Sequence, residues 1–275
     1  MHQHEFDMTH ADFEYIKQQL YTHAGIVLGE HKKEMVYSRL SRRIRQLKLN
    51  NFAQYCQYLE KHLQDELSTF VNALTTNLTS FFREYHHFEF LKKLAQTKWQ
   101  HDKNMNRKIR IWSAGCSTGE EPYSIAMTLS DSINLRHWDC KILATDLDSN
   151  VLNTAKQAQY DRRKLETSQI PLGLKYFERQ GSDEQLTVTD AVRQLVHVKR
   201  LNLLQPQWPM KGQFDVIFCR NVVIYFDLAT KNQLIRRYAQ YLKPNGFLFM
   251  GHSETMSRDI TDFKPLGQTI YQKQG

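Results

Sequence analysis

Two neighbouring glutamates follow a turn of small residues in the stretch IRIWSAGCSTGEE, residues 109–121. An apolar run that enters such a turn and then a helix commonly starts a nucleotide-binding unit, because the free amides at a helix start attract phosphate. Glu120 and Glu121 oppose that use, since carboxylates at this position weaken phosphate binding. Gly115 and Gly119 are four residues apart and no lysine follows, so the stretch fits neither the dinucleotide fingerprint nor the P-loop.

The chemistry of this turn suits a cationic nucleoside better than a phosphate. S-adenosylmethionine joins adenosine to methionine through a positively charged sulfonium. Its binding requires a tight turn for close backbone approach, an acid for the ammonium group and an acid for the ribose hydroxyls. Glu120 and Glu121 could instead serve only to stabilise the start of a helix. The turn by itself leaves both interpretations open.

A second acidic position, in the stretch KILATDLD at residues 141–148, favours the cofactor. An acid at the carboxyl end of the second strand is where nucleotide-binding α/β folds grip a ribose diol. Asp148 directly precedes Ser149 and suits the cap of a following helix. Asp146 is therefore the candidate for the ribose.

Polar residues also end the later apolar run FDVIFCRNVVIYF, residues 214–226, which contains Arg220 and Asn221. In open α/β sheets, ligands bind beyond the carboxyl ends of the strands. Asn221 is a candidate for the methionine part of the ligand and Tyr225 for the reacting group, although Tyr225 could also pack beneath a loop. The run lacks the Asn/Asp-Pro-Pro-aromatic tetrad of enzymes that methylate amino groups of bases, which argues against a DNA base as substrate.

The elements that must position these residues change character along the chain. Residues 9–80 repeat apolar side chains at helical spacing, which predicts a small bundle of short amphipathic helices, and residues 96–108 read as a polar connection. Beyond it, short β-rich runs alternate with helical patterns, which favours a parallel sheet covered by helices. The predicted strands are residues 109–114, 141–145, 195–199, 214–219 and 246–251, with an added edge strand at 269–272.

The composition sets limits on the class of protein. The 275 residues carry a net charge of +8. The sequence contains no run of about 18 apolar residues, so we expect no membrane span. Cys56, Cys116, Cys140 and Cys219 are scattered without a CxxC pair, which argues against a zinc site or a disulfide framework. We therefore expect a cytoplasmic protein, and the basic charge indicates either an acidic partner or simply a basic soluble protein.

Taken together, these stretches resemble the CheR family, the chemotaxis receptor methyltransferases that act as protein-glutamate O-methyltransferases. The matching segments keep the order of the family and span nearly the whole chain. They are TNLTSFFRE (76–84), WSAGCSTGEEPYSIA (112–126), ATDLD (144–148), LNLL (201–204), FDVIFCRNVVIYF (214–226) and GFLFMGHSE (246–254).

The resemblance implies a fold and a division of the chain. A small all-helical N-terminal domain would precede an α/β, Rossmann-like domain that binds S-adenosylmethionine and carries a small antiparallel β insert. The expected ranges are 1–86 for the helical domain, 87–108 for a linker helix and connection, and 109–275 for the methyltransferase domain. The insert is expected at about 176–200, with a turn at Gly181, Ser182 and Asp183.

The resemblance also assigns residues to the cofactor site. Glu121 matches the acid for the methionine ammonium, and Asp146 matches the ribose acid. No contact follows for Glu120. The remaining implied cofactor-binding residues are Asn77, Thr79 and Arg83 from the first segment, Asn202 and Leu203 beside the adenine, and Arg220 and Asn221, which close the site, with Tyr225 facing the methyl group.

The implied reaction needs little acid–base chemistry. The nucleophile would be a receptor glutamate, whose ordinary pKa near 4.3 leaves it ionised at neutral pH, so no general base is required. Methyl transfer then depends mainly on positioning. Arg83 and Tyr225 could orient the incoming carboxylate and are the catalytic candidates.

A row of arginines on the predicted second helix is the candidate docking surface. Arg39, Arg42 and Arg45 step three residues apart, with Arg43 beside them. Such a face is often only solvated. The resemblance gives it a partner, because the methylated region of the receptors is a glutamate-rich helical bundle. Some members of the family bind a C-terminal receptor peptide through a glycine-rich hairpin of the β insert. The insert of this sequence lacks such a hairpin, so we do not expect it to tether a receptor peptide.

Other partners and activities are less consistent with the sequence. We expect no metal, because the adjacent His86 and His87 have poor geometry for one ion. We also expect no nucleic acid, no membrane insertion and a monomer. Two alternatives remain: an RNA or DNA methyltransferase, supported by the basic charge, and a non-catalytic signalling module that senses S-adenosylmethionine.

Overall fold

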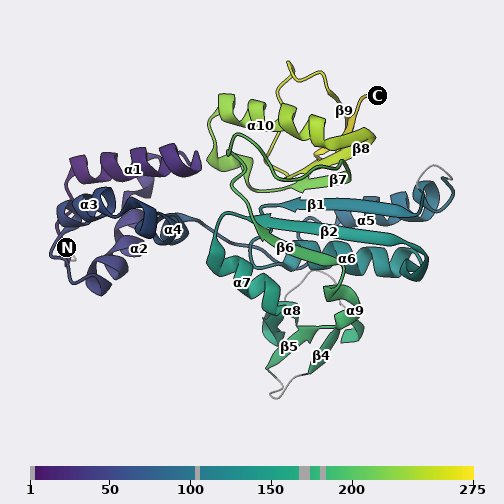
Figure 1. Ribbon diagram of the computed structural model, residues 1–275, viewed down its shortest axis with the longest axis horizontal. Coiled ribbons are helices and arrows are strands. Elements are labelled where there is room, and N and C mark those ends of the chain that lie inside the picture. Colours follow the sequence, from purple (N-terminus) through teal and green to yellow (C-terminus); the bar gives the residue numbers. More distant parts are fainter. Residues whose placement is uncertain (1–3, 103–105, 167–173, 180–183) are drawn as a thin grey trace. The chain divides into compact units, whose positions relative to one another are not determined.

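The computed structural model describes residues 4–102, 106–166, 174–179 and 184–275 (Figure 1). Contacts divide the chain into two compact units. The first comprises Met1–Thr76 with Tyr225–Thr230, and the second comprises Asn77–Ile224 with Lys231–Gly275. Within the described residues, no helix is long and apolar enough to cross a membrane.

The first unit is the helical bundle that the spacing of apolar residues predicts. Helix α1 begins at a capping box, in which the Thr9 hydroxyl accepts from the Asp12 amide and the Asp12 carboxylate accepts from the Thr9 amide, and it ends at Gly25 in the left-handed conformation. Each helix buries one apolar face, for example Phe13, Ile16 and Leu20 of α1. The helices are α1 (His10–Ala24), α2 (Lys33–Gln46), α3 (Phe52–Lys61) and α4 (Leu63–Leu74), with the 3-10 turn η1 (Glu30–Lys32) before α2.

The second unit is built on a seven-stranded sheet in the order β6-β2-β1-β7-β8-β10-β9 (Figure 1). The first five strands of this order are parallel, whereas β10 runs antiparallel to both of its neighbours. The strands are β1 (Lys108–Ala114), β2 (Asp139–Asp146), β6 (Val196–Arg200), β7 (Phe214–Cys219), β8 (Leu242–Met250), β9 (Phe263–Gly267) and β10 (Ile270–Lys273).

The C-terminal strand does not occupy the edge that the sequence analysis gave it. β10 lies between β8 and β9, and β9 forms the edge. Pro265 within β9 explains both the error and the arrangement. Proline reads as a strand breaker in sequence, and it is tolerated on an edge strand because that strand has one unpaired side.

The register of the parallel strands brings their carboxyl ends together. β1 pairs with β2 from Lys108 opposite Asp139 to Ala114 opposite Thr145, and Asp146 of β2 lies opposite Arg200 of β6. The chain order reverses at β1, which has β2 on one side and β7 on the other. Such a reversal point is where ligands bind in open α/β sheets.

Helices cover both faces of this sheet. Ile109 and Ile111 of β1 belong to one apolar cluster with Leu91 of α5 and Ile125 of α6. Trp112 follows Ile111 in the same strand and points to the opposite face, where it packs against Tyr238 of α10. The longer helices are α5 (His86–Leu94), continued by a π-helical turn η2 (Ala95–Trp99), α6 (Glu120–Ser132), α7 (Ser149–Gln157) and α10 (Leu228–Tyr241). The shorter ones are η4 (Leu135–His137), α8 (Arg162–Glu166), η5 (Leu174–Tyr176), α9 (Asp190–Arg193) and η6 (Val223–Tyr225).

The small antiparallel sheet has the order β3-β5-β4. Its strands are β3 (Gln159–Asp161), β4 (Phe177–Arg179) and β5 (Gln185–Val188), so it starts before the predicted insert and ends at Val188. The last part of the predicted range forms β6 of the main sheet. Tyr160 of β3 and Phe177 of β4 pack edge-to-face on Phe81, which holds the small sheet against the segment before α5 in the same unit. The predicted turn at Gly181, Ser182 and Asp183 lies outside the described residues.

Candidate active site

The turn after β1 requires glycine where the chain passes closest to its neighbours. The amides of Gly115 and Cys116 both donate to the Thr145 carbonyl, at 2.8 and 2.9 Å. Gly115 has φ of +91°, and a Cβ built on it would lie 2.3 Å from Cγ2 of Val222. A larger residue would therefore push apart the ends of β1 and β7, where the turn must stay tight.

The second glycine of the turn leads into helix α6. Gly119 has φ of +101°, and a Cβ there would lie 2.7 Å from the Tyr160 hydroxyl, which donates to the Thr118 carbonyl. Glu120 is buried, and its carboxylate accepts from the Thr118 hydroxyl at 2.5 Å. Glu120 thus closes the turn from inside, which is a structural role that its sequence position does not reveal.

Glu121 is partly buried beside the end of β1, next to the buried side chains of Ser113 and Arg220. Its carboxylate accepts from the Ser113 hydroxyl at 2.7 Å and from Arg220 Nη1 at 3.1 Å. Burial raises the pKa of Glu121, whereas the charge of Arg220 and the hydrogen bond from Ser113 act in the opposite direction. The site therefore contains a partly buried acid that is already paired with a cation of the chain itself, Arg220.

Asp146 ends β2 close to the same turn. Its carboxylate accepts from the amides of Ser117, at 2.9 Å, and Asp148, at 3.0 Å. Burial raises the pKa of Asp146, while these backbone hydrogen bonds lower it. The Leu201 amide donates to the Asp146 carbonyl at 3.0 Å, which brings the segment that holds Asn202 and Leu203 beside this acid.

Asp148 has the capping role that its position before Ser149 predicts. Its Oδ1 accepts from the Asn150 amide at 2.8 Å at the start of α7. Its Oδ2 accepts from the side-chain amide of Asn77 at 2.8 Å. The Ser117 hydroxyl donates to the Asn77 carbonyl at 3.0 Å. Asn77 is thereby tied to both the turn after β1 and the loop after β2.

The segment that follows Asn77 is held against the same region. The Phe82 amide donates to the Ser124 hydroxyl of α6 at 3.0 Å, and Phe82 is buried. Arg83 Nη1 donates to the Leu78 carbonyl at 2.9 Å, which closes the segment into a loop. Thr79 is half-buried within that loop. These contacts position three of the predicted cofactor residues: Asn77, Thr79 and Arg83.

Arg220 follows β7 and lies in the centre of the charged cluster. Only 2% of its side chain is exposed, and it makes ion pairs with Glu121 at 3.1 Å and with Glu84 at 3.2 Å. Its Nη2 also donates to the Arg83 carbonyl, and the guanidinium lies 5.7 Å from the ring centroid of Phe88. Glu84 was not among the predicted site residues, because its proximity to Arg220 depends on the tertiary fold.

Asn221 has a left-handed backbone, with φ of 58°, and a buried acid holds this conformation. Glu254 is 1% exposed and accepts from the amides of Asn221 and Val222, both at 2.9 Å, and of Gly251 at 2.6 Å. It also accepts from the Ile224 amide at 3.3 Å. The sequence analysis assigned Glu254 no role, although it ends the family-like segment GFLFMGHSE.

The loop after β6 carries the residues expected beside the adenine. Asn202 Oδ1 accepts from the Leu204 amide at 2.9 Å, and Leu203 is buried. The Leu203 carbonyl accepts from the Trp208 indole at 3.2 Å. The loop is thus fixed by local hydrogen bonds and presents one polar and one apolar side chain next to the end of β2.

Tyr225 and helix α2, which carries the row of arginines, belong to the first unit. Tyr225 ends η6, and its carbonyl accepts from the Val27 amide at 2.8 Å. Arg39 donates to the carbonyls of Leu74 and Thr75, at 3.0 and 2.6 Å, and so caps the end of α4. Arg43 binds the buried Glu66 through two nitrogens, Arg45 pairs with Glu5, and Arg42 is exposed. Arg39 and Arg43 thus bind groups of the bundle itself.

Among the described residues, Glu84, His86 and His87 each have one potential metal-binding atom within 4.8 Å of the others. Arg220 lies 3.2 Å from Glu84 and already supplies a positive charge at this position. Burial and the charge of Arg220 lower the pKa of His87 to about 3, so this imidazole is neutral at physiological pH. Its Nε2 lies 2.9 Å from the Gln268 carbonyl and therefore carries the ring proton.

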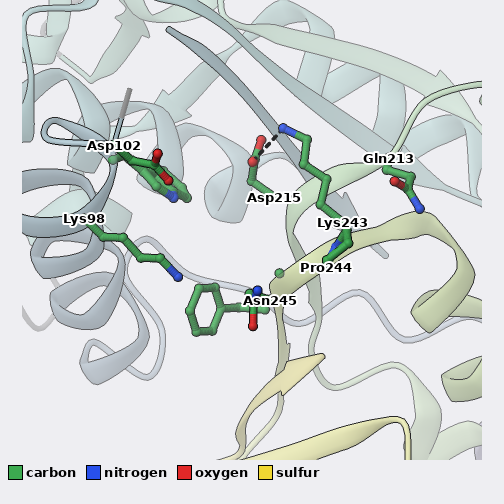
Figure 2. A pocket seen from close by; sticks show the side chains of 10 residues that line it. Lys98, Asp102, Gln213, Asp215, Lys243, Pro244 and Asn245 are labelled. Carbon is green, nitrogen blue, oxygen red and sulfur yellow. Dashed lines mark hydrogen bonds and ion pairs between the residues drawn. The ribbon is translucent and has the colours of Figure 1, made fainter. Parts of the chain in front are cut away.

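A separate cavity of about 580 Å³ opens at the other end of the strands (Figure 2). Asp215, near the start of β7, pairs with Lys243 of β8 at 2.7 Å and accepts from the Arg110 amide at 2.8 Å. Figure 2 shows Lys98 and Asp102 across the cavity from this pair. None of its lining residues is a predicted site residue; they are Lys98, Trp99, Asp102, Gln213, Asp215, Lys243, Pro244, Asn245, Gly246 and Phe247.

The donor set at the carboxyl ends of the strands fits S-adenosylmethionine. Two partly buried acids, Glu121 and Asp146, lie close to the glycine turn after β1, and α6 begins with acids rather than with basic residues. This set suits a ligand with an ammonium group and a ribose, and it disfavours a pyrophosphate.

Comparisons with known proteins agree with this chemistry. Residues 77–272 match the family described as CheR methyltransferase, SAM binding domain, and residues 11–75 match the CheR methyltransferase, all-alpha domain. The chain is 44% identical to chemotaxis protein methyltransferase 2 of Pseudomonas aeruginosa, over 97% of this chain and 94% of that protein. It is 43% identical to the chemotaxis protein methyltransferases of Salmonella typhimurium and Escherichia coli, over 96% of this chain and 90% and 91% of theirs. On the strength of these matches across both units, the chain belongs to the CheR methyltransferase family.

Proposed function

We propose that this chain transfers the methyl group of S-adenosylmethionine to glutamate side chains of membrane chemoreceptors and so forms glutamate methyl esters. The observation that carries the proposal is the pair of partly buried acids, Glu121 at the start of α6, bonded to Ser113 of β1, and Asp146 at the end of the neighbouring parallel strand β2. Membership of the CheR family and the similarity to chemotaxis protein methyltransferases support the same reaction.

In this proposal, each strand end contributes one part of the cofactor site. Glu121 binds the ammonium group and Asp146 the ribose hydroxyls. The adenine lies against the loop after β6, and the methionine part lies near the ends of β1 and β7. The remaining cofactor-binding residues are Asn77, Thr79, Arg83, Asn202, Leu203, Arg220 and Asn221.

Bound S-adenosylmethionine would supply a methyl group activated by its sulfonium. The protein then has to orient a receptor carboxylate that is already ionised at neutral pH. We assign this orientation to Arg83 and Tyr225. Arg83 lies in the loop that Asn77 anchors to the cofactor turn, and Tyr225 follows Asn221 by four residues at the end of η6.

The exposed arginines of α2 are the proposed contacts to the acidic receptor bundle. Arg42 and Arg45 suit this role best, because Arg42 is exposed and the Arg45–Glu5 pair is half exposed on both sides. Exposed ion pairs of this kind contribute little to stability, so Arg45 can exchange Glu5 for a receptor glutamate at low cost. We expect the enzyme to act as a monomer in the cytoplasm.

A methyl-ester assay tests the proposed function directly. The protein is incubated with tritiated S-adenosylmethionine and receptor-containing membranes, and the products are then treated with base. We expect label to be released as volatile methanol, since methyl esters hydrolyse under these conditions. Arg83→Ala should reduce the released label strongly, whereas Lys211→Ala, an exposed change outside the proposed site, should leave it unchanged. Label that stays attached as N-methyl groups would contradict the proposal.

A further inference from the structure

Two acids share one buried guanidinium in the second unit. Arg220 pairs with Glu121 at 3.1 Å and with Glu84 at 3.2 Å, while 12% of the Glu121 side chain and 10% of the Glu84 side chain are exposed. A single carboxylate would already balance the charge of Arg220. The second carboxylate gives the cluster two acids for one guanidinium, so the cluster can accept a further cationic partner.

Glu84 is held in place by its own set of contacts. Its backbone has φ of 56°, in the left-handed region that non-glycine residues seldom adopt. Its Oε1 lies 3.0 Å from Nδ1 of His252. Burial acts to raise the pKa of Glu84, but the charge of Arg220 and the hydrogen bond with His252 outweigh it and lower the pKa to about 2. Glu84 therefore stays ionised throughout the physiological range.

This arrangement resolves a conflict at Glu121. The proposed function gives Glu121 the cofactor ammonium as its ligand, yet Arg220 already occupies one side of this carboxylate. If Glu121 were the only acid near Arg220, the guanidinium and the ammonium would compete for it. Glu84 provides Arg220 with a second carboxylate, and the Arg83 carbonyl accepts from the same guanidinium nitrogen, Nη2.

We propose that Glu84 is a positioning residue that neutralises Arg220 and so keeps Glu121 available to the ammonium group of the cofactor. The inference rests on the proposed function, since it takes S-adenosylmethionine as the ligand of Glu121. Glu84 acts through Arg220 and need not touch the cofactor itself.

Binding of three nucleosides separates this role from a general effect on the fold. S-adenosylhomocysteine carries the ammonium and the carboxylate, decarboxylated S-adenosylhomocysteine carries only the ammonium, and 5′-methylthioadenosine carries neither. In calorimetric titrations, Glu84→Gln should weaken binding of the first two about tenfold and should change binding of 5′-methylthioadenosine by less than about twofold. Glu84→Asp, which restores the charge, should recover most of the lost affinity.

Glu89→Gln is the matched control, because Glu89 is an exposed acid in the first turn of α5 and its loss removes the same charge. It should leave all three affinities unchanged. An equal loss for all three nucleosides in Glu84→Gln, or no loss for any, would overturn the inference while leaving the proposed cofactor intact. A wild-type protein that binds none of the three would overturn the proposed function, and this inference with it. If Glu84→Gln fails to fold, Glu84→Asp decides alone: a small loss confined to the two nucleosides with an ammonium group supports the inference, and an equal loss for all three or no loss contradicts it.

Discussion

At the scale of single residues, the two acids proposed to bind the cofactor have different neighbours and therefore different sensitivities. Glu121 faces a cation of the chain, whereas Asp146 accepts hydrogen bonds from two backbone amides. Loss of charge at Asp146 should affect the ribose rather than the methionine part of the cofactor. Ligands with and without the methionine part can therefore distinguish the role of Glu121 from that of Asp146.

We expect Asp146→Asn to weaken binding of S-adenosylhomocysteine and of 5′-methylthioadenosine to the same extent, because both carry the ribose. A hydrogen bond to a charged group contributes about 1.5–3 kcal/mol, which corresponds to a loss of about tenfold to 150-fold in affinity. Calorimetric titration measures both constants. Asp190→Asn, at a side chain that is 81% exposed, is the control and should change neither. A loss confined to S-adenosylhomocysteine would instead assign Asp146 to the methionine part.

The sequence predicted the residues that lie next to one another along the chain and missed those that meet only in the fold. Asp146 was proposed because it ends a β-rich run, whereas the residues alone left Glu120 and Glu121 open and the family resemblance assigned Glu121. Glu84 and Glu254 were missed because their partners, Arg220 and the amides after it, come from distant segments. No local spacing encodes such a contact.

At the scale of elements, one side chain fixes the loop that follows β7. Glu254 gathers four backbone amides from this loop and from the end of β8. A buried amide that loses its acceptor costs about 1–3 kcal/mol, so the conformation of the loop depends on this carboxylate.

Glu254→Ala should therefore lower the free energy of unfolding by about 3 kcal/mol or more, with Glu254→Gln intermediate because its amide oxygen can still accept. Urea denaturation measures the change as a lower midpoint. Glu178→Ala, at an exposed position of β4, provides the comparison and should leave the midpoint unchanged. A Glu254→Ala midpoint equal to that of the wild type would show that the loop holds its shape without this acid.

The class of fold was predictable because apolar periodicity is a local property. The helical spacing of residues 9–80 and the alternation beyond residue 108 led to the correct architecture. The order of the strands in the sheet was not predictable, since strand pairing joins segments far apart in the sequence. The position of β10 inside the sheet, with β9 at the edge, is of this kind, whereas the strand at 195–199 was predicted and forms β6 of the main sheet.

At the scale of the whole molecule, the net charge of +8 and the exposed arginines of α2 predict an electrostatic contribution to receptor recognition. Arg42→Glu should reduce the rate of receptor methylation several-fold and should make the rate less sensitive to salt, because screening acts on exposed charges. Affinity for S-adenosylhomocysteine should not change. Lys211→Glu carries the same change of charge in the second unit and should have a smaller effect. A rate that is flat between low and high salt in the wild type would remove this contribution.

The helical unit is discontinuous in the sequence, because Tyr225–Thr230 groups with Met1–Thr76. The Tyr21 hydroxyl donates to Asp227 at 3.0 Å, and the Val27 amide donates to the Tyr225 carbonyl at 2.8 Å. A fragment cut at Thr76 would lack both acceptors. A chimera that exchanges the bundle would keep both hydrogen bonds only if it also carried this short second segment.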